Sequence, residues 1–255
     1  MKAVKPVDSG DRYERIGAGY AATRRTDPRI AARVHAALGG ARTVVNVGAG
    51  AGSYEPTDRE VIAIEPSETM AAQRPSTLVP ATIARAEALP LADGSVDAAM
   101  AVVTIHHWTE PRTGIEEMRR VARERVVVLT FDPEVISRAW IRDYAPRIRR
   151  FDAEMPPIAE LADWMGGAEV EVIPSRNDCE DLFLETLLGR PELILDSRVR
   201  ANTSAFARLP DDEEARAVER LAADLRSGEW DRRYADLRGP AERDGGMRLV
   251  VAGRP

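Results

Sequence analysis

Short apolar runs recur along the first half of the chain and are separated by more polar segments. The runs lie at residues 43–47, 61–64, 81–85, 96–102 and 125–131, of which 81–85 is the weakest. Runs that are continuously apolar are typical of parallel strands buried on both faces of a sheet. Helical spacing lies between them, from residue 52, over 67–72 and over 112–122. This alternation predicts an α/β fold with right-handed crossovers and helices on both sides of the sheet.

A further helical pattern precedes the first strand, over residues 12–38. Asp27 and Pro28 form a helix start, with Asp27 as the N-cap and Pro28 at the first helical position. Gly39 and Gly40 follow the last apolar position, so we expect the helix to end there.

The order of elements changes after residue 132. Helical patterns and single strands follow in the order helix 133–145, helix 156–165, strand 169–173, several helices over 178–236, and strand 247–252. We expect a single domain with four parts: an N-terminal helical cap over 11–40, a core over 41–177, a helical insert over 178–240 and a last strand over 246–253. Ligands bind at the carboxyl ends of the strands in such sheets, so the insert is placed to act as a lid.

The first apolar run opens into a glycine-rich loop that contains Gly48, Gly50 and Gly52. Glycines in such a turn let the backbone approach a ligand closely. The dinucleotide fingerprint G-x-G-x-x-G would require a third glycine at position 53, which is Ser53. The lysine of a phosphate-binding P-loop is also missing. The second run ends in Glu65, whose carboxylate can accept hydrogen bonds from both hydroxyls of a ribose.

The loop and four later segments together resemble the motifs of class I S-adenosylmethionine (SAM) dependent methyltransferases, in their small-molecule type 11 branch. The segments are residues 43–54, 62–70, 86–97, 101–108 and 116–121. The resemblance implies a Rossmann-like, doubly wound, seven-stranded and mostly parallel sheet with an antiparallel last strand. It also implies SAM as cofactor and S-adenosylhomocysteine (SAH) as product.

The resemblance further implies which side chains hold the cofactor. The expected cofactor-binding residues are Gly48, Ala49, Gly50, Glu65, Pro66, Met70, Ala86, Glu87 and Val102, together with Tyr20 and Arg25 from the N-terminal segment. Arg25 would meet the carboxylate of the methionine part. Many members carry an acid near the adenine amino group at the position that is Arg85 here, so the adenine contact departs from the family pattern.

Two adjacent histidines follow the 96–102 strand, at the expected edge of the active site. Histidine has an ordinary pKa near 6.5, which suits a general base near neutral pH. By resemblance, His106 faces the substrate and is the candidate catalytic base, while His107 packs inward. The alternative is that both imidazoles are structural. His35 lies in the N-terminal helical pattern, and we expect it to have a surface or packing role.

Composition excludes several classes of partner. The net charge of −6 argues against nucleic acid, which needs a basic face. The sole cysteine, Cys179, permits no intrachain disulfide and lies among acids that would raise the pKa of its thiol. No metal site, signal peptide or membrane span is indicated, so we expect a cytoplasmic protein.

The acceptor is expected to be a small, partly apolar metabolite, with a place in secondary-metabolite biosynthesis. An apolar stripe at residues 182–188 would line the lid, or would merely pack on the sheet or in a dimer interface. The protein would be a monomer or a homodimer. Methylation of nucleic-acid bases is disfavoured because Ile105–Trp108 stand where a [DNS]-P-P-[YF] motif would lie.

Two other interpretations stay open. One is a SAM- or SAH-binding protein without methyl transfer, either regulatory or catalysing a rearrangement or cyclisation. The other is a dinucleotide or nucleotide-sugar oxidoreductase, against which the missing third glycine counts.

Overall fold

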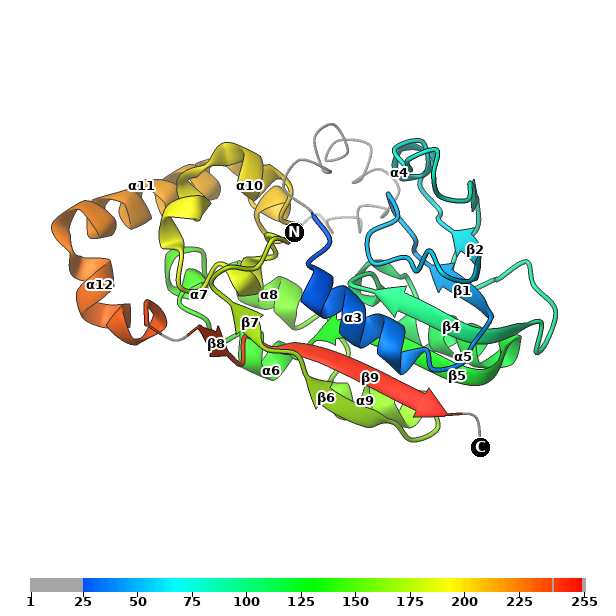
Figure 1. The fold of residues 1–255 in the computed structure, drawn as a ribbon. Helices are drawn as coiled ribbons and strands as arrows, with labels where there is room; N and C mark the ends of the chain where they lie inside the picture. The colour runs from blue at the N-terminus through cyan, green and yellow to red at the C-terminus, as the bar shows by residue number, and fades with distance from the viewer. Residues whose placement is uncertain (1–24, 240, 254–255) are drawn as a thin grey trace, which may run out of the picture.

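A computed structural model describes residues 25–239 and 241–253 of the chain. Its centre is a seven-stranded sheet in the order β3-β2-β1-β4-β5-β9-β6 (Figure 1). The strands are β1 (Thr43–Val47), β2 (Glu60–Ile64), β3 (Ala81–Thr82), β4 (Val96–Val102), β5 (Ala122–Phe131), β6 (Glu169–Val172) and β9 (Met247–Gly253). Strands β1 to β5 are parallel, and β9 runs antiparallel to both β5 and β6. The predicted fold class is confirmed, with an antiparallel last strand.

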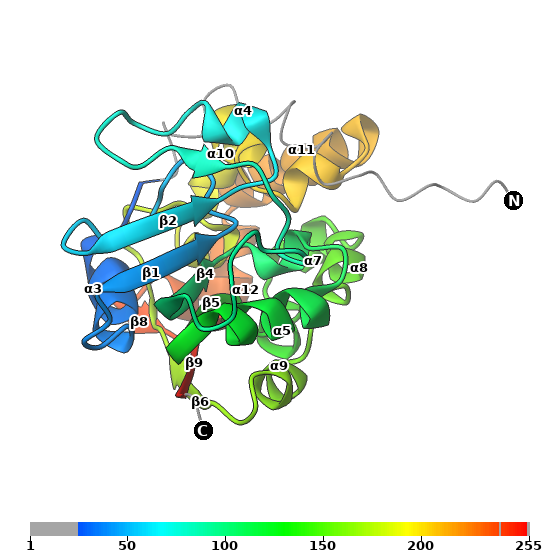
Figure 2. The ribbon, with the colours of Figure 1, turned by 90° about the vertical axis from the view of Figure 1, so that its right-hand side faces the viewer.

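Helices cover both faces of the sheet because successive strand residues point to opposite sides. Val45 packs with α5 (Pro111–Val121) and α9 (Ile158–Trp164), while Val44 packs with α3 (Pro28–Ala37). Figure 2 shows α3 on one side of the strands and α5 and α9 on the other. The continuous apolar runs therefore supply two cores at once, as expected for buried parallel strands.

The connection from β1 to β2 differs from the prediction. Residues 48–59 form turns and bends, so the helix expected from residue 52 is absent. Gly48, Gly50, Gly52 and Tyr54 all have positive φ, between 51° and 97°. An α-helix requires negative φ at every residue, so this alternation of backbone conformations prevents a helix.

The predicted ends of α3 are confirmed. The Asp27 side chain accepts a hydrogen bond from the backbone N–H of Arg29, as an N-cap does, and Pro28 is the first helical residue. Gly39 follows the helix with a φ of 57°. Residues 12–24 of the predicted pattern lie outside the described part of the chain.

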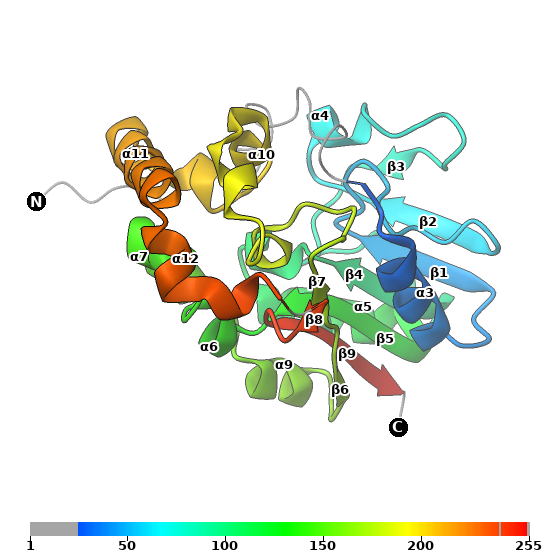
Figure 3. The same ribbon diagram turned by 60° about the vertical axis from the view of Figure 1, so that its left-hand side comes forward.

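A block of helices, most of them short, lies at the end of the sheet toward which the parallel strands point (Figures 1 and 3). Its helices are α7 (Ile141–Tyr144), α8 (Ile148–Asp152), η2 (Leu184–Thr186), η3 (Pro191–Leu195), α10 (Ser197–Ala201), η4 (Phe206–Arg208), α11 (Asp211–Ser227), α12 (Glu229–Tyr234) and η5 (Ala235–Leu237). We call them the helical block. α6 (Pro133–Ile136) connects β5 to it. A small antiparallel pair that was not predicted, β7 (Ser175–Arg176) and β8 (Glu242–Arg243), lies at its base.

The helical block has a hydrophobic core of its own, centred on Trp140 and Trp230. Leu184, Leu187 and Leu188 of the predicted apolar stripe are buried in that core. Most of the stripe therefore packs within the block and does not line an open lid surface, because short helices need a shared core to be stable. No helix in the described residues is long and apolar enough to cross a membrane.

Candidate functional site

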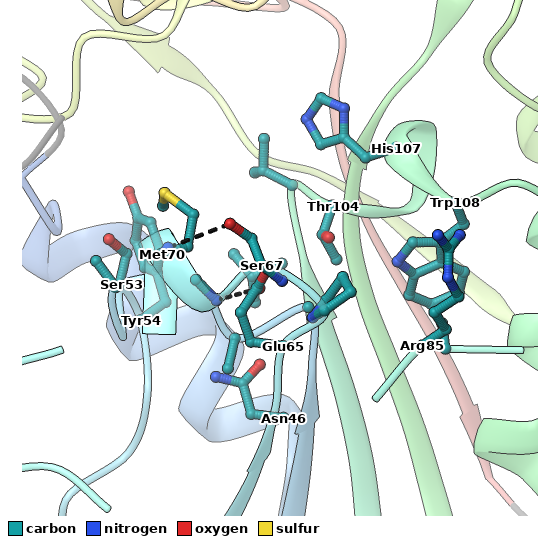
Figure 4. A pocket seen from close by; sticks show the side chains of 18 of the residues that line it. Asn46, Ser53, Tyr54, Glu65, Ser67, Met70, Arg85, Thr104, His107 and Trp108 are labelled. Carbon is teal, nitrogen blue, oxygen red and sulfur yellow. Dashed lines mark hydrogen bonds between the residues drawn. The ribbon is translucent and has the colours of Figure 1, made fainter. Parts of the chain in front are cut away.

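A cavity opens at the carboxyl ends of β1, β2 and β4 (Figure 4). Among the predicted residues, those that line it are Gly48, Ala49, Gly50, Glu65, Pro66, Met70, Ala86, Glu87 and Val102. Arg25 is exposed and does not line the cavity, and Tyr20 lies outside the described residues. Residues far apart in sequence thus meet because parallel strands end at one edge of the sheet.

The glycine loop forms one wall, and its shape depends on the missing side chains. The backbone N–H groups of Gly48 and Ala49 both donate to the carbonyl of Ile64, at 2.8 and 2.9 Å, which locks the loop onto β2. A Cβ built on Gly48 would overlap the side chain of Thr104 from the adjacent strand end. Since φ is also positive at Gly48, glycine alone fits this position.

Glu65 lies between the glycine loop and the start of α4 (Glu68–Ala71). One carboxylate oxygen accepts from the N–H of Gly50 at 2.8 Å, and the other accepts from the N–H of Ser67 at 2.9 Å. The side chain is buried, and this burial raises the pKa of Glu65 despite the two hydrogen bonds. A carboxylate offers about four acceptor positions, so further donors from a ligand can be accepted at the cavity.

A buried polar network supports the loop from behind. Glu55 forms an ion pair with Arg74 at 2.7 Å, and both side chains are almost fully buried. The amide of Asn46, at the end of β1, donates to Glu55 at 3.0 Å. This network links β1, the loop and the segment after α4, and it holds their spacing where a crossover helix would usually do so.

The two histidines follow β4, on a turn at the edge of the cavity. His107 lines the cavity, whereas His106 does not, and the ring centroids of the pair are 3.9 Å apart. This differs from the expectation that His107 packs inward. The two residues lie on the 3₁₀ turn η1 (Ile105–His107), where successive side chains point in different directions. The catalytic role predicted for His106 stays a prediction.

The chain enters this turn through a strained residue. Within residues 25–239 and 241–253, the non-glycine residues with positive φ are Tyr54 and Val103, and both line the cavity. Positive φ is rare for a tyrosine and rarer still for a β-branched valine. Such conformations concentrate at functional sites, where the surrounding structure enforces them.

At the far rim of the cavity, the Glu87 carboxylate forms hydrogen bonds within the protein. Its carboxylate accepts hydrogen bonds from the N–H groups of Thr109 and Glu110, at 2.8 and 3.1 Å. It therefore holds the turn that leads into α5. Arg85 and Trp108 also line the cavity, and Figure 4 shows them close together.

Sequence reasoning did not assign the other residues of the wall to cofactor binding, and it missed Thr109 altogether. These are Asn46, Ala51, Ser53, Tyr54, Ser67, Arg85, Val103, Thr104, His107, Trp108 and Thr109. Five of them directly follow or precede a predicted residue, namely Ala51, Ser67, Arg85, Val103 and His107, so adjacency to a predicted residue was the available signal for these five. His35, by contrast, packs as expected, with its Nε2 3.0 Å from the carbonyl oxygen of Tyr54.

Cys179 is buried in the segment between β7 and η2. Burial, together with the nearby carboxylate of Asp27, raises the pKa of the Cys179 thiol to about 12. The direction of this shift was predicted, although desolvation contributes more to it than the neighbouring acids. A thiol with so high a pKa is not a nucleophile near neutral pH.

Comparison with known families gives one match, and it covers this edge of the sheet. A family profile described as "Methyltransferase domain" matches residues 45–130. That range begins within β1 and ends within β5, so it contains the glycine loop, Glu65 and both histidines.

Three solved structures illustrate the range of similar proteins. One, from Anabaena variabilis, is described as a methyltransferase from an antibiotic biosynthesis pathway. It is 31% identical over 90% of this chain and 98% of its own, with a TM-score of 0.84. Geranyl diphosphate C-methyltransferase from Streptomyces coelicolor is 15% identical over 89% and 79%, with a TM-score of 0.53. The [4+2]-cyclase SpnF is 16% identical over 98% and 97%, with a TM-score of 0.57. The last two show the fold alone. No functionally curated protein matches the chain.

Proposed function

We propose that this chain, which belongs to the class I SAM-dependent methyltransferases, transfers a methyl group from SAM to a small, partly apolar metabolite. The cofactor of the family is SAM, which supplies a methyl group that its sulfonium already activates. The observation that carries the proposal is the position of Glu65, a buried carboxylate held between the glycine loop and α4 at the wall of the cavity.

The residues present fit this cofactor. The Glu65 carboxylate can accept further hydrogen bonds from ribose hydroxyls. The glycine loop forms a wall of the cavity, and a Cβ at Gly48 would disturb the shape of that wall. Pro66, Met70 and Ala86 supply apolar surface beside the carboxylate. A wall of this kind, which combines apolar surface with several polar side chains, suits a nucleoside.

The proposal for the methyl acceptor rests on the chemistry of methyl transfer and on the charge of the chain. Methyl transfer needs alignment of donor and acceptor and exclusion of water, and it needs a base only if the acceptor must lose a proton. His106 and His107 are the imidazoles at this edge of the sheet. The net charge of −6 disfavours a polyanionic acceptor. We place the protein in the cytoplasm, as a monomer or homodimer, with a role in secondary-metabolite biosynthesis.

Two experiments test the proposal. Calorimetry with SAM, SAH, NAD and NADP should show binding of the first pair only, and this binding should weaken in Glu65→Ala. An assay that uses SAM with an isotope-labelled methyl group, run against a library of small metabolites, should then give a labelled product. Binding of SAM without any labelled product would favour the non-methylating alternative, and binding of NAD or NADP would contradict the proposal.

A further inference from the structure

Tyr54 joins the cavity wall to the rest of the molecule through both its backbone and its side chain. It directly follows the glycine loop, lines the cavity and is 2% exposed. Its N–H donates to the Thr26 hydroxyl at 3.2 Å, and its carbonyl faces His35. These contacts hold the residue at a φ of 63°, which a tyrosine rarely adopts.

The tyrosine hydroxyl reaches the segment that leads into η2 of the helical block. It donates to the carboxylate of Asp181 at 2.8 Å, across 127 positions of sequence. Asp181 is fully buried. A buried carboxylate is sensitive to each of its hydrogen-bond donors, so the position of Asp181 depends on that of Tyr54.

A second pair of contacts runs parallel to this one. The ring of Phe183 stacks on that of Tyr54, with centroids 6.5 Å apart. The N–H of Glu180 donates to the buried carboxylate of Asp27 at 3.1 Å. The segment 179–183 therefore rests on the cavity wall and on the start of α3, but its chain continues into the core of the helical block through Leu184.

We propose that Tyr54 and Asp181 are a positioning pair that couples the donor pocket to the helical block. Occupation of the pocket restricts Tyr54, whose ring forms part of the wall, and the hydroxyl transmits this restriction to residues 179–186. The donor then binds first and orders the segment that leads into η2 of the helical block. This inference rests on the proposed function, because it takes SAM as the ligand of the pocket.

Coupling between two sites is reciprocal, which sets the size of the expected effect. If SAH binding favours the ordered helical block by some factor, the ordered block strengthens SAH binding by the same factor. A variant that lacks the coupling should therefore bind SAH more weakly by that factor. We expect this factor to be about fivefold or more, the lower end of ordinary coupling between sites.

The test is hydrogen exchange of the full chain, with and without saturating SAH. In the wild type, SAH should slow exchange both in the glycine loop and in residues 179–186. In Tyr54→Phe the ring and its stacking on Phe183 stay but the hydroxyl is lost, so the glycine loop should remain protected while most of the effect at 179–186 is lost. Asp181→Asn, which keeps an acceptor oxygen for the tyrosine, should retain part of it.

Tyr144→Phe is the matched control. Its hydroxyl donates to Asp224 at 2.7 Å inside the helical block, away from the cavity. This variant should keep the SAH-dependent protection at 179–186 even if it unfolds at a lower temperature. A wild type in which SAH protects the glycine loop but not 179–186 would overturn the coupling alone, as would full protection in Tyr54→Phe. A wild type in which SAH protects neither segment would overturn the proposed function together with this inference.

Discussion

The carboxylate of Glu65 accepts a hydrogen bond from the backbone N–H of Gly50 at 2.8 Å, so the end of β2 holds the glycine loop that follows β1. The two residues are 15 positions apart, and the contact exists because β1 and β2 pair in parallel with Val47 opposite Ile64. Pairing in this register brings both strand ends to one edge of the cavity. The loop and the carboxylate therefore form one structural unit.

Replacement of Glu65 should weaken cofactor binding without unfolding the protein. Glu65→Ala removes acceptors for the ribose hydroxyls, so SAM binding should weaken by about 1.5–3 kcal/mol, the scale of a charge-assisted hydrogen bond. Calorimetry measures the difference. Glu60→Gln, at the exposed start of β2, is the control and should bind SAM as the wild type does. Equal affinity in Glu65→Ala and wild type would exclude the ribose contact.

The affinity for SAH should also depend on pH through the same carboxylate. Burial raises the pKa of Glu65 in the ligand-free protein, so the group takes up its proton at a higher pH than an ordinary glutamate. Ribose hydroxyls favour the ionised form, so affinity should fall as pH falls through this raised pKa. Conversely, the raised pKa means that the contribution of Glu65 to stability is lost as pH rises through it. Calorimetry across mildly acidic pH should show a slope that is absent in Glu65→Gln.

A methyl group at Gly48 should damage the loop. Gly48→Ala would strain a φ of 73° and would push against Thr104, so we expect a loss of at least about 1 kcal/mol of stability and weaker SAM binding. Gly40→Ala is the control because its Cβ would meet no neighbouring atom and its φ is not positive. Urea unfolding and calorimetry of both variants give the comparison. Similar behaviour of the two would contradict the tight packing at Gly48.

The buried ion pair behind the loop should be far more important for stability than an exposed one. Arg74→Met leaves the Glu55 carboxylate buried without its main partner, which should lower the free energy of unfolding by about 3–5 kcal/mol. Arg112→Met breaks the exposed ion pair with Glu116 and should change the free energy of unfolding by about 0.5 kcal/mol or less. Chemical denaturation measures both. A small loss in Arg74→Met would mean that Glu55 finds other partners.

Substitutions of the two histidines should have different effects on kcat. His107 lines the cavity, so if the acceptor must lose a proton, His107→Ala should lower kcat by about 10²-fold and leave SAM affinity unchanged. His106→Ala should then have a smaller effect, through the packing of the two rings. The labelled-methyl assay with the identified acceptor decides. The reverse order of effects would support the sequence-based assignment of the base to His106.

Most of the sheet could be predicted from the sequence because each buried strand is a local apolar run. The runs at 43–47 and 96–102 coincide with β1 and β4, and Asp27 with Pro28 marked the start of α3. The glycine loop and Glu65 were recognisable for a similar reason, since both directly follow a strand. Their meeting in one cavity followed from the rule that parallel strands end at a common edge.

The remaining features depend on contacts between distant parts of the chain. Tyr54 meets Asp181, and Glu55 meets Arg74, because of how the segments fold onto one another, and no local pattern marks such pairs. The absence of a helix after the glycine loop depends on positive φ at a tyrosine, a state that tertiary contacts enforce against its own preference. Which histidine lines the cavity was likewise decided by a single 3₁₀ turn. Sequence by itself therefore determined the order of the seven strands of the main sheet and the residues at the strand ends, whereas only the tertiary structure decided which of those side chains line the cavity and what holds them there.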